Sequence, residues 1–147
     1  MADCQESPIS NMAFLYSRTI RLADTDAAGV VYFTRVLDIC HEAYEAYLHE
    51  GKISLPHLLH NLEIALPIVH AEVNFLRPLM WGNQIEVEVR PQPIEENEFR
   101  IEYKIISNWK TDPKAKVIAQ TRHLCINANS RKRVSLPPQL QAWFKSP

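Results

Sequence analysis

Two carboxylates, Asp24 and Asp26, lie two residues apart in the segment Asp24-Thr25-Asp26-Ala27-Ala28-Gly29, just before a stretch with the pattern of a long helix. The first turn of a helix has unpaired backbone N–H groups and a partial positive charge, so it can polarise a carbonyl or hold an oxyanion. A nearby carboxylate can attack that carbonyl or activate a water. Gly29 and two alanines would let a substrate approach the backbone closely. Hydrolysis of a thioester needs these parts and little acid help, because a thiolate leaves well.

Helix capping is the alternative interpretation of the same segment. An Asp before a helix commonly accepts a hydrogen bond from a first-turn N–H and has no other role. Spacing alone favours capping, so a catalytic role needs further support.

The elements that would position these carboxylates follow from the periodicity of apolar residues. Steps of three and four from about residue 31 to residue 50 predict a helix with one buried face, and Gly51 suits its end. Ser54 suits the N-cap of a short second helix. Alternation of apolar and polar residues predicts strands near 14–22, 69–75, 85–90, 99–105 and 117–127, and a short helix is expected near 139–144.

This order of elements predicts the fold class. The four later strands are joined by short connections, which favour antiparallel pairing, and the long helix is the element large enough to cover the sheet. We therefore expect an α+β fold with an antiparallel sheet wrapped around a long central helix. A chain of 147 residues fits one domain. We expect that domain at residues 13–147, after a flexible N-terminal tail at residues 1–12.

Composition narrows the class of partner. Lys and Arg number 16, Asp and Glu number 17, and the net charge is -1, which argues against nucleic acid or an anionic membrane as the main partner. The three cysteines form no Cys-x-x-Cys motif, so neither a disulfide framework nor a zinc site is expected. No signal peptide and no membrane-spanning apolar run are recognisable. These features favour a cytoplasmic protein with no metal or cofactor.

The segment from Asp24 through Val30-Val31-Tyr32-Phe33 resembles the signature of the 4-hydroxybenzoyl-CoA thioesterase family of hotdog proteins. The similarity extends more weakly over roughly residues 14–126. It implies a single hotdog domain, with Asp26 as the catalytic carboxylate and Asp24 in a supporting role. It also implies that the Phe33 N–H polarises the thioester carbonyl. Members of the family typically form dimers that pair into homotetramers, with active sites at subunit interfaces.

Within that family the chain looks most like the cyanobacterial 1,4-dihydroxy-2-naphthoyl-CoA hydrolases. The resemblance is carried by Leu22-Ala23-Asp24-Thr25-Asp26, Cys40-His41-Glu42-Ala43-Tyr44-Glu45, Leu66-Pro67-Ile68-Val69-His70-Ala71 and His123-Leu124-Cys125-Ile126. It implies release of 1,4-dihydroxy-2-naphthoate and CoA in phylloquinone biosynthesis. The alternatives are a broader thioesterase for acyl-ACP or for short or aromatic acyl-CoA, and a non-catalytic hotdog protein that binds acyl ligands. Phe33 replaces a His found in many short-chain relatives, which favours an aromatic pocket.

Residues that would contact the substrate are expected in two groups. Gly29, Val30, Tyr32 and Phe33 adjoin the catalytic loop, and His70 lies on a strand that could line the pocket. The alternative for His70 and for His123 is a strand histidine whose hydrogen bonds are all made with neighbouring residues of the protein.

The densest basic cluster, Arg131-Lys132-Arg133, is a candidate for binding CoA phosphates. A solvated turn is the alternative for this cluster. The loop at Glu95-Glu96-Asn97 is acidic where the benzoyl-CoA enzyme has basic residues, so CoA must be held elsewhere or loosely. His57 and His60 have helical spacing but no third ligand, which favours surface histidines over a metal site.

Overall fold

The computed structural model describes residues 13–108 and 110–146. In chain order the elements are β1 (Phe14–Thr19), the 3-10 turn η1 (Leu22–Asp24), α1 (Phe33–Glu50), α2 (Leu55–Leu62), β2 (Ile64–Ala65), β3 (Ile68–Phe75), β4 (Gln84–Glu95), β5 (Glu98–Asn108), β6 (Asp112–Leu124), β7 (Ile126–Asn127) and α3 (Pro138–Lys145). The tail expected at residues 1–12 lies outside the described residues.

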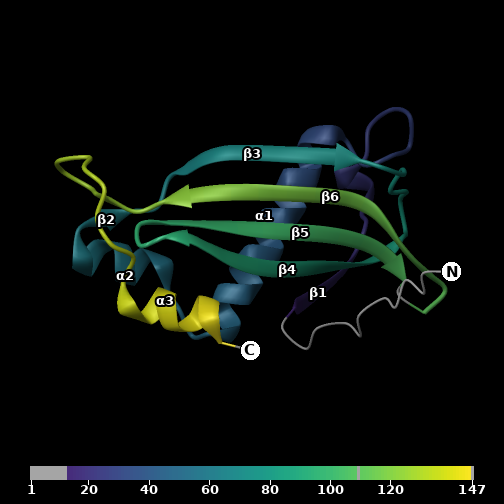
Figure 1. The fold of residues 1–147 in the computed structure, drawn as a ribbon. Coiled ribbons are helices and arrows are strands. Elements are labelled where there is room, and N and C mark those ends of the chain that lie inside the picture. The colour runs from purple at the N-terminus through teal and green to yellow at the C-terminus, as the bar shows by residue number, and fades with distance from the viewer. Residues whose placement is uncertain (1–12, 109, 147) are drawn as a thin grey trace, which may run out of the picture.

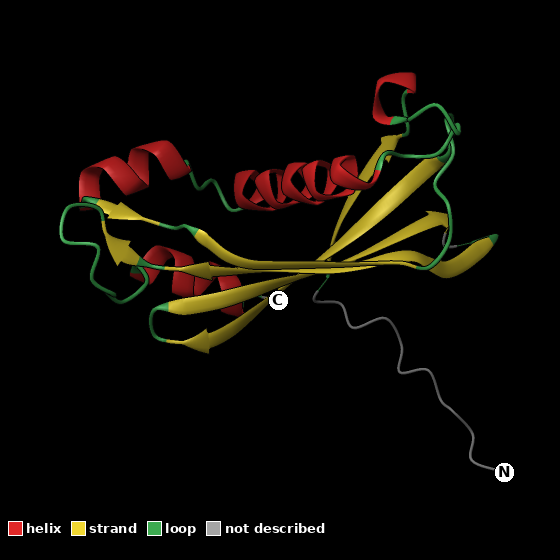
Figure 2. Cartoon of the chain, turned by 90° about the horizontal axis from the view of Figure 1, so that it is seen from above, coloured by secondary structure: helices red, strands yellow, loops and turns green. Residues whose placement is uncertain are grey.

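One five-stranded sheet has the order β1-β4-β5-β6-β3, and every neighbouring pair in it is antiparallel. The short strands β2 and β7 pair at one end of the molecule (Figure 1). Helix α1 lies along one face of the curved sheet (Figure 2). This arrangement confirms the α+β fold with an antiparallel sheet around a long central helix.

The core forms between α1 and the inner face of the sheet. The helix buries one stripe of its surface, and the facing strand residues Val87, Ile101 and Ile105 are fully buried. Burial of these aliphatic side chains is the main force that holds the helix on the sheet. Helix α3 closes one end of the core, where the rings of Phe144 and Phe99 lie 4.4 Å apart.

Two strand boundaries differ from those that the periodicity predicted. The first strand ends at Thr19, because the carboxylate of Asp24 accepts the backbone N–H of Arg21 at 2.8 Å and turns the chain into η1. The last strand begins at Asp112 and is interrupted at Cys125, whose N–H donates to the Asn97 carbonyl at 2.8 Å. Ser54 occupies the predicted N-cap of α2, but its side chain makes no capping hydrogen bond.

Strand β3 lies at the edge of the sheet and pairs only with β6. Every one of its residues is exposed except Val73, which is half-buried. An exposed edge strand has unpaired N–H and C=O groups that can pair with another chain. None of the helices in the described part of the chain has the length and hydropathy to cross a membrane.

Candidate active site

The loop that joins η1 to α1 is fixed by backbone hydrogen bonds at both ends. The Asp26 N–H donates to the Val30 carbonyl at 2.9 Å, and the Gly29 N–H donates to the Asp26 carbonyl at 3.0 Å. The Tyr32 N–H donates to the Asp24 carbonyl at 2.9 Å. Gly29 has a φ of +81°, a left-handed conformation that glycine adopts without strain. The loop is therefore a short closed turn with Asp26 at its start.

Asp24 is buried beneath this loop, with a relative exposure of 1%. Its carboxylate accepts Arg18 Nη2 at 2.6 Å, Arg35 Nη2 at 3.1 Å and the Arg21 N–H at 2.8 Å. Burial alone would raise the pKa of Asp24, but these hydrogen bonds and the two guanidinium charges outweigh it and hold the pKa below its ordinary value. Both carboxylate oxygens are thus occupied, and Asp24 anchors the loop to β1 and α1.

Asp26 differs from Asp24 because it is exposed. One of its carboxylate oxygens accepts the Ala28 N–H at 2.8 Å, which fixes the side chain over the turn. Its other oxygen has no partner among the residues that the structure describes. Asp26 therefore presents a free carboxylate oxygen at the surface of one chain.

The start of α1 has no side-chain cap. Tyr32 is the N-cap residue, and within the described residues neither the Asp24 nor the Asp26 carboxylate accepts a backbone N–H of the first turn. The N–H groups of Phe33 and Thr34 have no acceptor within residues 13–108 and 110–146. Uncapped first-turn N–H groups are suited to a carbonyl oxygen or an oxyanion. The capping interpretation of the Asp segment is therefore not supported.

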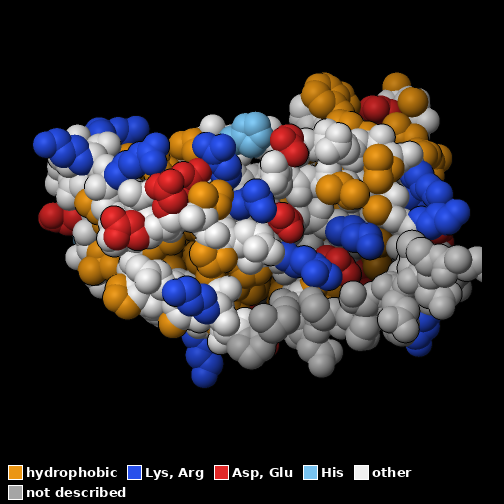
Figure 3. Space-filling model, in the orientation of Figure 1, with side chains coloured by type: hydrophobic (Ala, Val, Ile, Leu, Met, Phe, Trp, Pro, Cys, Tyr) orange, Lys and Arg blue, Asp and Glu red, His pale blue; other side chains and the backbone are white. Residues whose placement is uncertain are grey.

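Apolar surface surrounds the start of α1. Phe33 is 60% exposed and Tyr32 is 44% exposed, and their rings contact each other at 4.9 Å. Hydrophobic side chains gather over this end of the molecule, whereas acidic and basic side chains alternate over the rest of the face in view (Figure 3). An apolar cleft of about 270 Å³ adjoins the loop, lined by Val30, Val31 and Phe75 among others. A charged carboxylate beside apolar surface is the setting expected for an acyl substrate.

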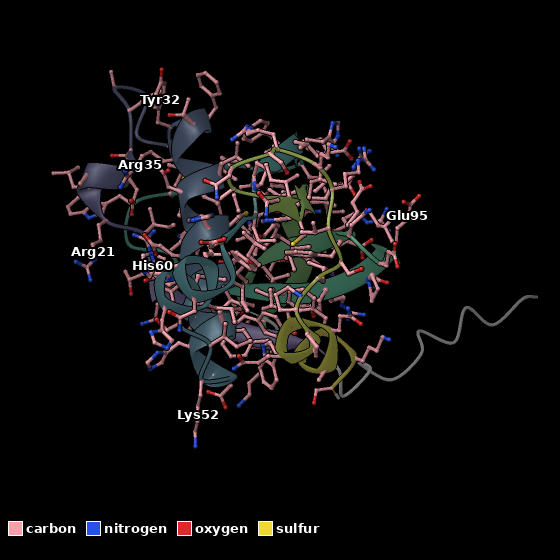
Figure 4. All side chains as sticks on the ribbon, turned by 90° about the vertical axis from the view of Figure 1, so that its left-hand side faces the viewer. Arg21, Tyr32, Arg35, Lys52, His60 and Glu95 are labelled. Carbon is pink, nitrogen blue, oxygen red and sulfur yellow. The ribbon has the colours of Figure 1, made fainter. Side chains whose placement is uncertain are left out.

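One chain brings together most of the expected substrate contacts. Gly29, Val30, Tyr32 and Phe33 all lie at the Asp26 loop or the first turn of α1. Figure 4 shows Tyr32 and Arg35 near one end of α1, with Lys52 beyond its other end.

His70 lies elsewhere. It is paired in register with Arg122 on β6, and the next pair, Ala71 with the buried Thr121, faces the opposite side of the sheet. His70 is therefore on the outer face, away from α1, where its ring lies 3.2 Å from a Glu72 carboxylate oxygen. A contact between His70 and a substrate stays a prediction.

The basic cluster Arg131, Lys132 and Arg133 is exposed and follows β7. It lies at the opposite end of the sheet from the Asp26 loop, as the green-yellow loop at the left and the dark blue loop at the upper right of Figure 1 show. A single chain therefore does not bring the proposed phosphate contacts to the carboxylate.

Sequence periodicity missed the residues that support the loop. Arg18 lies on β1 and Arg35 in the first turn of α1, so their convergence on Asp24 depends on the tertiary fold. Glu42, on the central helix, accepts the Tyr16 hydroxyl at 3.1 Å. The one available signal was Arg18, a charged residue on the same half-buried face of β1 as Phe14 and Tyr16.

Comparisons with known proteins identify the family of this chain. The model of the thioesterase-like superfamily matches residues 20–144. The chain belongs to this superfamily. It is 44% identical to a 1,4-dihydroxy-2-naphthoyl-CoA hydrolase of Picosynechococcus, over 92% of this chain and 94% of the relative. A corresponding hydrolase of Gloeothece citriformis is 47% identical, over 88% of this chain and 90% of the relative.

A solved structure supports the same assignment. The crystal structure of a 1,4-dihydroxy-2-naphthoyl-CoA thioesterase from Synechocystis superposes with a TM-score of 0.84 at 36% identity, covering 90% of this chain and 95% of the other. This likeness confirms the expected hotdog fold. Membership of the thioesterase-like superfamily also confirms the expected enzyme class, a thioesterase.

Proposed function

We propose that this thioesterase hydrolyses 1,4-dihydroxy-2-naphthoyl-CoA to 1,4-dihydroxy-2-naphthoate and CoA, with Asp26 as the catalytic carboxylate. The observation that carries the proposal is the free oxygen of Asp26 beside the uncapped first turn of α1. The substrate follows from relatives that bear this activity in their names and are 36–47% identical over most of the chain. The proposed reaction belongs to phylloquinone biosynthesis and takes place in the cytoplasm.

In the proposed mechanism the Phe33 N–H and the partial positive charge of the α1 N-terminus stabilise the developing oxyanion. Asp26 either attacks the thioester carbonyl, which releases CoA thiolate and forms a mixed anhydride that water then hydrolyses, or it removes a proton from a water that attacks the carbonyl and expels CoA thiolate. Asp24 holds the loop in place through Arg18 and Arg35. A single turnover in heavy-oxygen water distinguishes the two routes, because only the anhydride route puts solvent oxygen into Asp26.

The proposal includes a second copy of the chain. The exposed β3 edge can pair with the same strand of another copy around a two-fold axis, which makes the paired strands antiparallel. That pairing would bring the end of one copy that has Arg131, Lys132 and Arg133 beside the end of the other that has Asp26 (Figure 1). CoA phosphates would then be bound by the basic cluster of the partner. A homotetramer would form from two such dimers.

The test measures free-thiol release from 1,4-dihydroxy-2-naphthoyl-CoA, benzoyl-CoA and hexanoyl-CoA. The wild type is expected to act fastest on the naphthoyl substrate, and Asp26→Asn should lower turnover by about 10²- to 10⁴-fold. Asp38→Asn is the matched control, since Asp38 is an exposed carboxylate on α1 whose ion pair among the described residues is with Arg35. It should leave turnover within about twofold.

Each other outcome points to a different function. Comparable rates on all three substrates would indicate a thioesterase of broad specificity. Tight binding of acyl-CoA without thiol release would indicate a ligand-binding protein. Normal turnover by Asp26→Asn would refute the catalytic role of Asp26, whatever the substrate.

A further inference from the structure

Asp24 connects the two groups that the proposed reaction needs. It lies two residues before Asp26, and its backbone carbonyl accepts the N–H of Tyr32 at 2.9 Å. Tyr32 directly precedes Phe33, whose N–H would stabilise the oxyanion. The position of Asp24 therefore sets the distance between the Asp26 carboxylate and the Phe33 N–H, and a displaced Asp24 would disturb both groups.

Two arginines hold the Asp24 side chain, and they differ in burial. Arg18 Nη2 lies 2.6 Å from one carboxylate oxygen, and the Arg18 side chain is mostly buried. Arg35 Nη2 lies 3.1 Å from the other oxygen, and the Arg35 side chain is largely in water. A charge-assisted hydrogen bond that is shorter and less exposed to water holds its partner more firmly. Arg18 is therefore the main anchor of Asp24.

Arg18 is itself held by a second carboxylate. Its other terminal nitrogen, Nη1, lies 3.4 Å from the carboxylate of Glu42 on α1. The same carboxylate accepts the Tyr16 hydroxyl at 3.1 Å, so it is tied to β1 at two points. A guanidinium has its donors in a rigid planar fork, and a carboxylate on each side of the fork fixes its rotation. Glu42 therefore keeps the Nη2 group of Arg18 directed at Asp24.

Glu42 lies too far along α1 to touch the reacting carbonyl. It follows Phe33 by nine residues, which is about 14 Å along the helix axis. Its hydrogen-bond partners among the described residues are Tyr16 and Arg18. The Glu42 side chain is 41% exposed, so its ion pair with Arg18 adds little to the stability of the fold. What this carboxylate supplies is the orientation of Arg18.

We propose that Glu42 is a positioning residue for the thioesterase reaction, which acts through Arg18 and Asp24 on the separation of Asp26 and the Phe33 N–H. This inference rests on the proposed catalytic role of Asp26, but it does not depend on the identity of the acyl group. Without the charge of Glu42, the Arg18 side chain can rotate away from Asp24, and the loop loses its fixed position. The substrate still binds, but the carboxylate and the N–H are less often aligned with its carbonyl.

The first experiment separates catalysis from binding and from stability. Glu42→Gln keeps the size of the side chain and an acceptor for Tyr16, but it removes the charge that orients Arg18. On the fastest of the three thioesters it should lower kcat about tenfold and change KM less than about twofold. Its Tm should fall by less than about 4 °C. Glu50→Gln is the matched control, since Glu50 is an exposed carboxylate at the last residue of the same helix, and it should leave kcat and KM within about twofold.

The second experiment tests whether the effect passes through Arg18. Arg18→Lys keeps the positive charge but lacks the planar fork, so it cannot hold Asp24 and Glu42 together in a fixed geometry. It should lower kcat at least as much as Glu42→Gln does. The double variant should have a kcat within about twofold of that of Arg18→Lys alone, because the two residues act as one unit. Independent effects would multiply, so a double variant about tenfold slower than Arg18→Lys would refute this route.

The outcomes separate the inference from the proposed function. If Asp26→Asn stops thiol release but Glu42→Gln leaves kcat unchanged, the positioning role is wrong and the proposed function stands. A rise in KM without a fall in kcat would assign Glu42 to binding, and a fall in kcat that only follows a large fall in Tm would assign it to stability. Either result overturns the positioning role. If Asp26→Asn keeps normal turnover, the proposed function fails and the positioning role fails with it.

Discussion

Replacement of Asp24 by alanine should destabilise the fold by about 3 kcal/mol at pH 7. The largest part comes from Arg18, whose side chain is only 12% exposed and would lose its partner at 2.6 Å. Breaking a buried ion pair costs about 3–5 kcal/mol, and the lower value applies because Glu42 remains 3.4 Å from Arg18. Arg35 is 41% exposed, so water screens its bond to Asp24 and the loss of that bond adds little.

The assay is thermal unfolding of the variant and the wild type. A loss of about 3 kcal/mol in a chain of this size lowers Tm by about 6–12 °C. Asp38→Ala is the control, because that carboxylate is 60% exposed and pairs only with Arg35, so Tm should change by less than about 2 °C.

The pH dependence has a definite sign. The pKa of folded Asp24 lies below its ordinary value of 3.8, so its stabilisation is fully present above that value. It is lost as the pH falls through the folded-state pKa, so the Tm gap between the wild type and Asp24→Ala should narrow below about pH 4. The ion-pair argument is wrong if Asp24→Ala has the same Tm as Asp38→Ala. It is also wrong if the Tm difference between the wild type and Asp24→Ala stays constant as the pH falls below about 4.

Three further substitutions test separate features. A Cβ on Gly51 would lie 2.5 Å from the Trp143 ring, so Gly51→Ala should cost about 1–3 kcal/mol by chemical denaturation. Gly82→Ala has open space around its Cβ but a φ of +83°, so it should show only the cost of backbone strain, about 1–2 kcal/mol. Gly29→Ala meets no atom but keeps a φ of +81°, so we expect a cost of about 1–2 kcal/mol and slower thiol release. Burial lowers the pKa of His123 from 6.5 to about 4, so stability should fall as the pH drops from 6.5 towards 4. His123→Phe should remove this pH dependence of stability. If the variant keeps the same pH dependence, other groups are its cause.

The periodicity of apolar residues predicted the helix and the strands that pack one face on the core. Residues 31–50 bury a stripe at helical spacing, and α1 begins within two residues of the expected position. The alternating strands were predicted for the same reason, because one face of each packs on the core. The pairing of β3 with β6 rather than with β4 could not be predicted from the sequence, since strand order depends on contacts between distant segments.

Short elements and convergent side chains were beyond the reach of sequence patterns. The 3-10 turn at Leu22–Asp24 has three residues, which is less than one period of an α-helix, so it leaves no periodic pattern in the sequence. It forms because the Asp24 carboxylate accepts the Arg21 N–H. The approach of Arg18 and Arg35 to Asp24 joins β1, the loop and α1, three segments that only the fold brings together.

The two carboxylates of the loop could not be told apart by spacing, but their surroundings separate their roles. Both oxygens of Asp24 accept hydrogen bonds from groups that lie beneath the loop, so a substrate could reach that carboxylate only by breaking an ion pair. Asp26 has one oxygen fixed by the Ala28 N–H and one that is free, on the exposed side of the same turn. A nucleophile or base must be both oriented and accessible. Asp26 meets both conditions, and the proposed reaction therefore depends on Asp26 for chemistry and on Asp24 for the position of the loop.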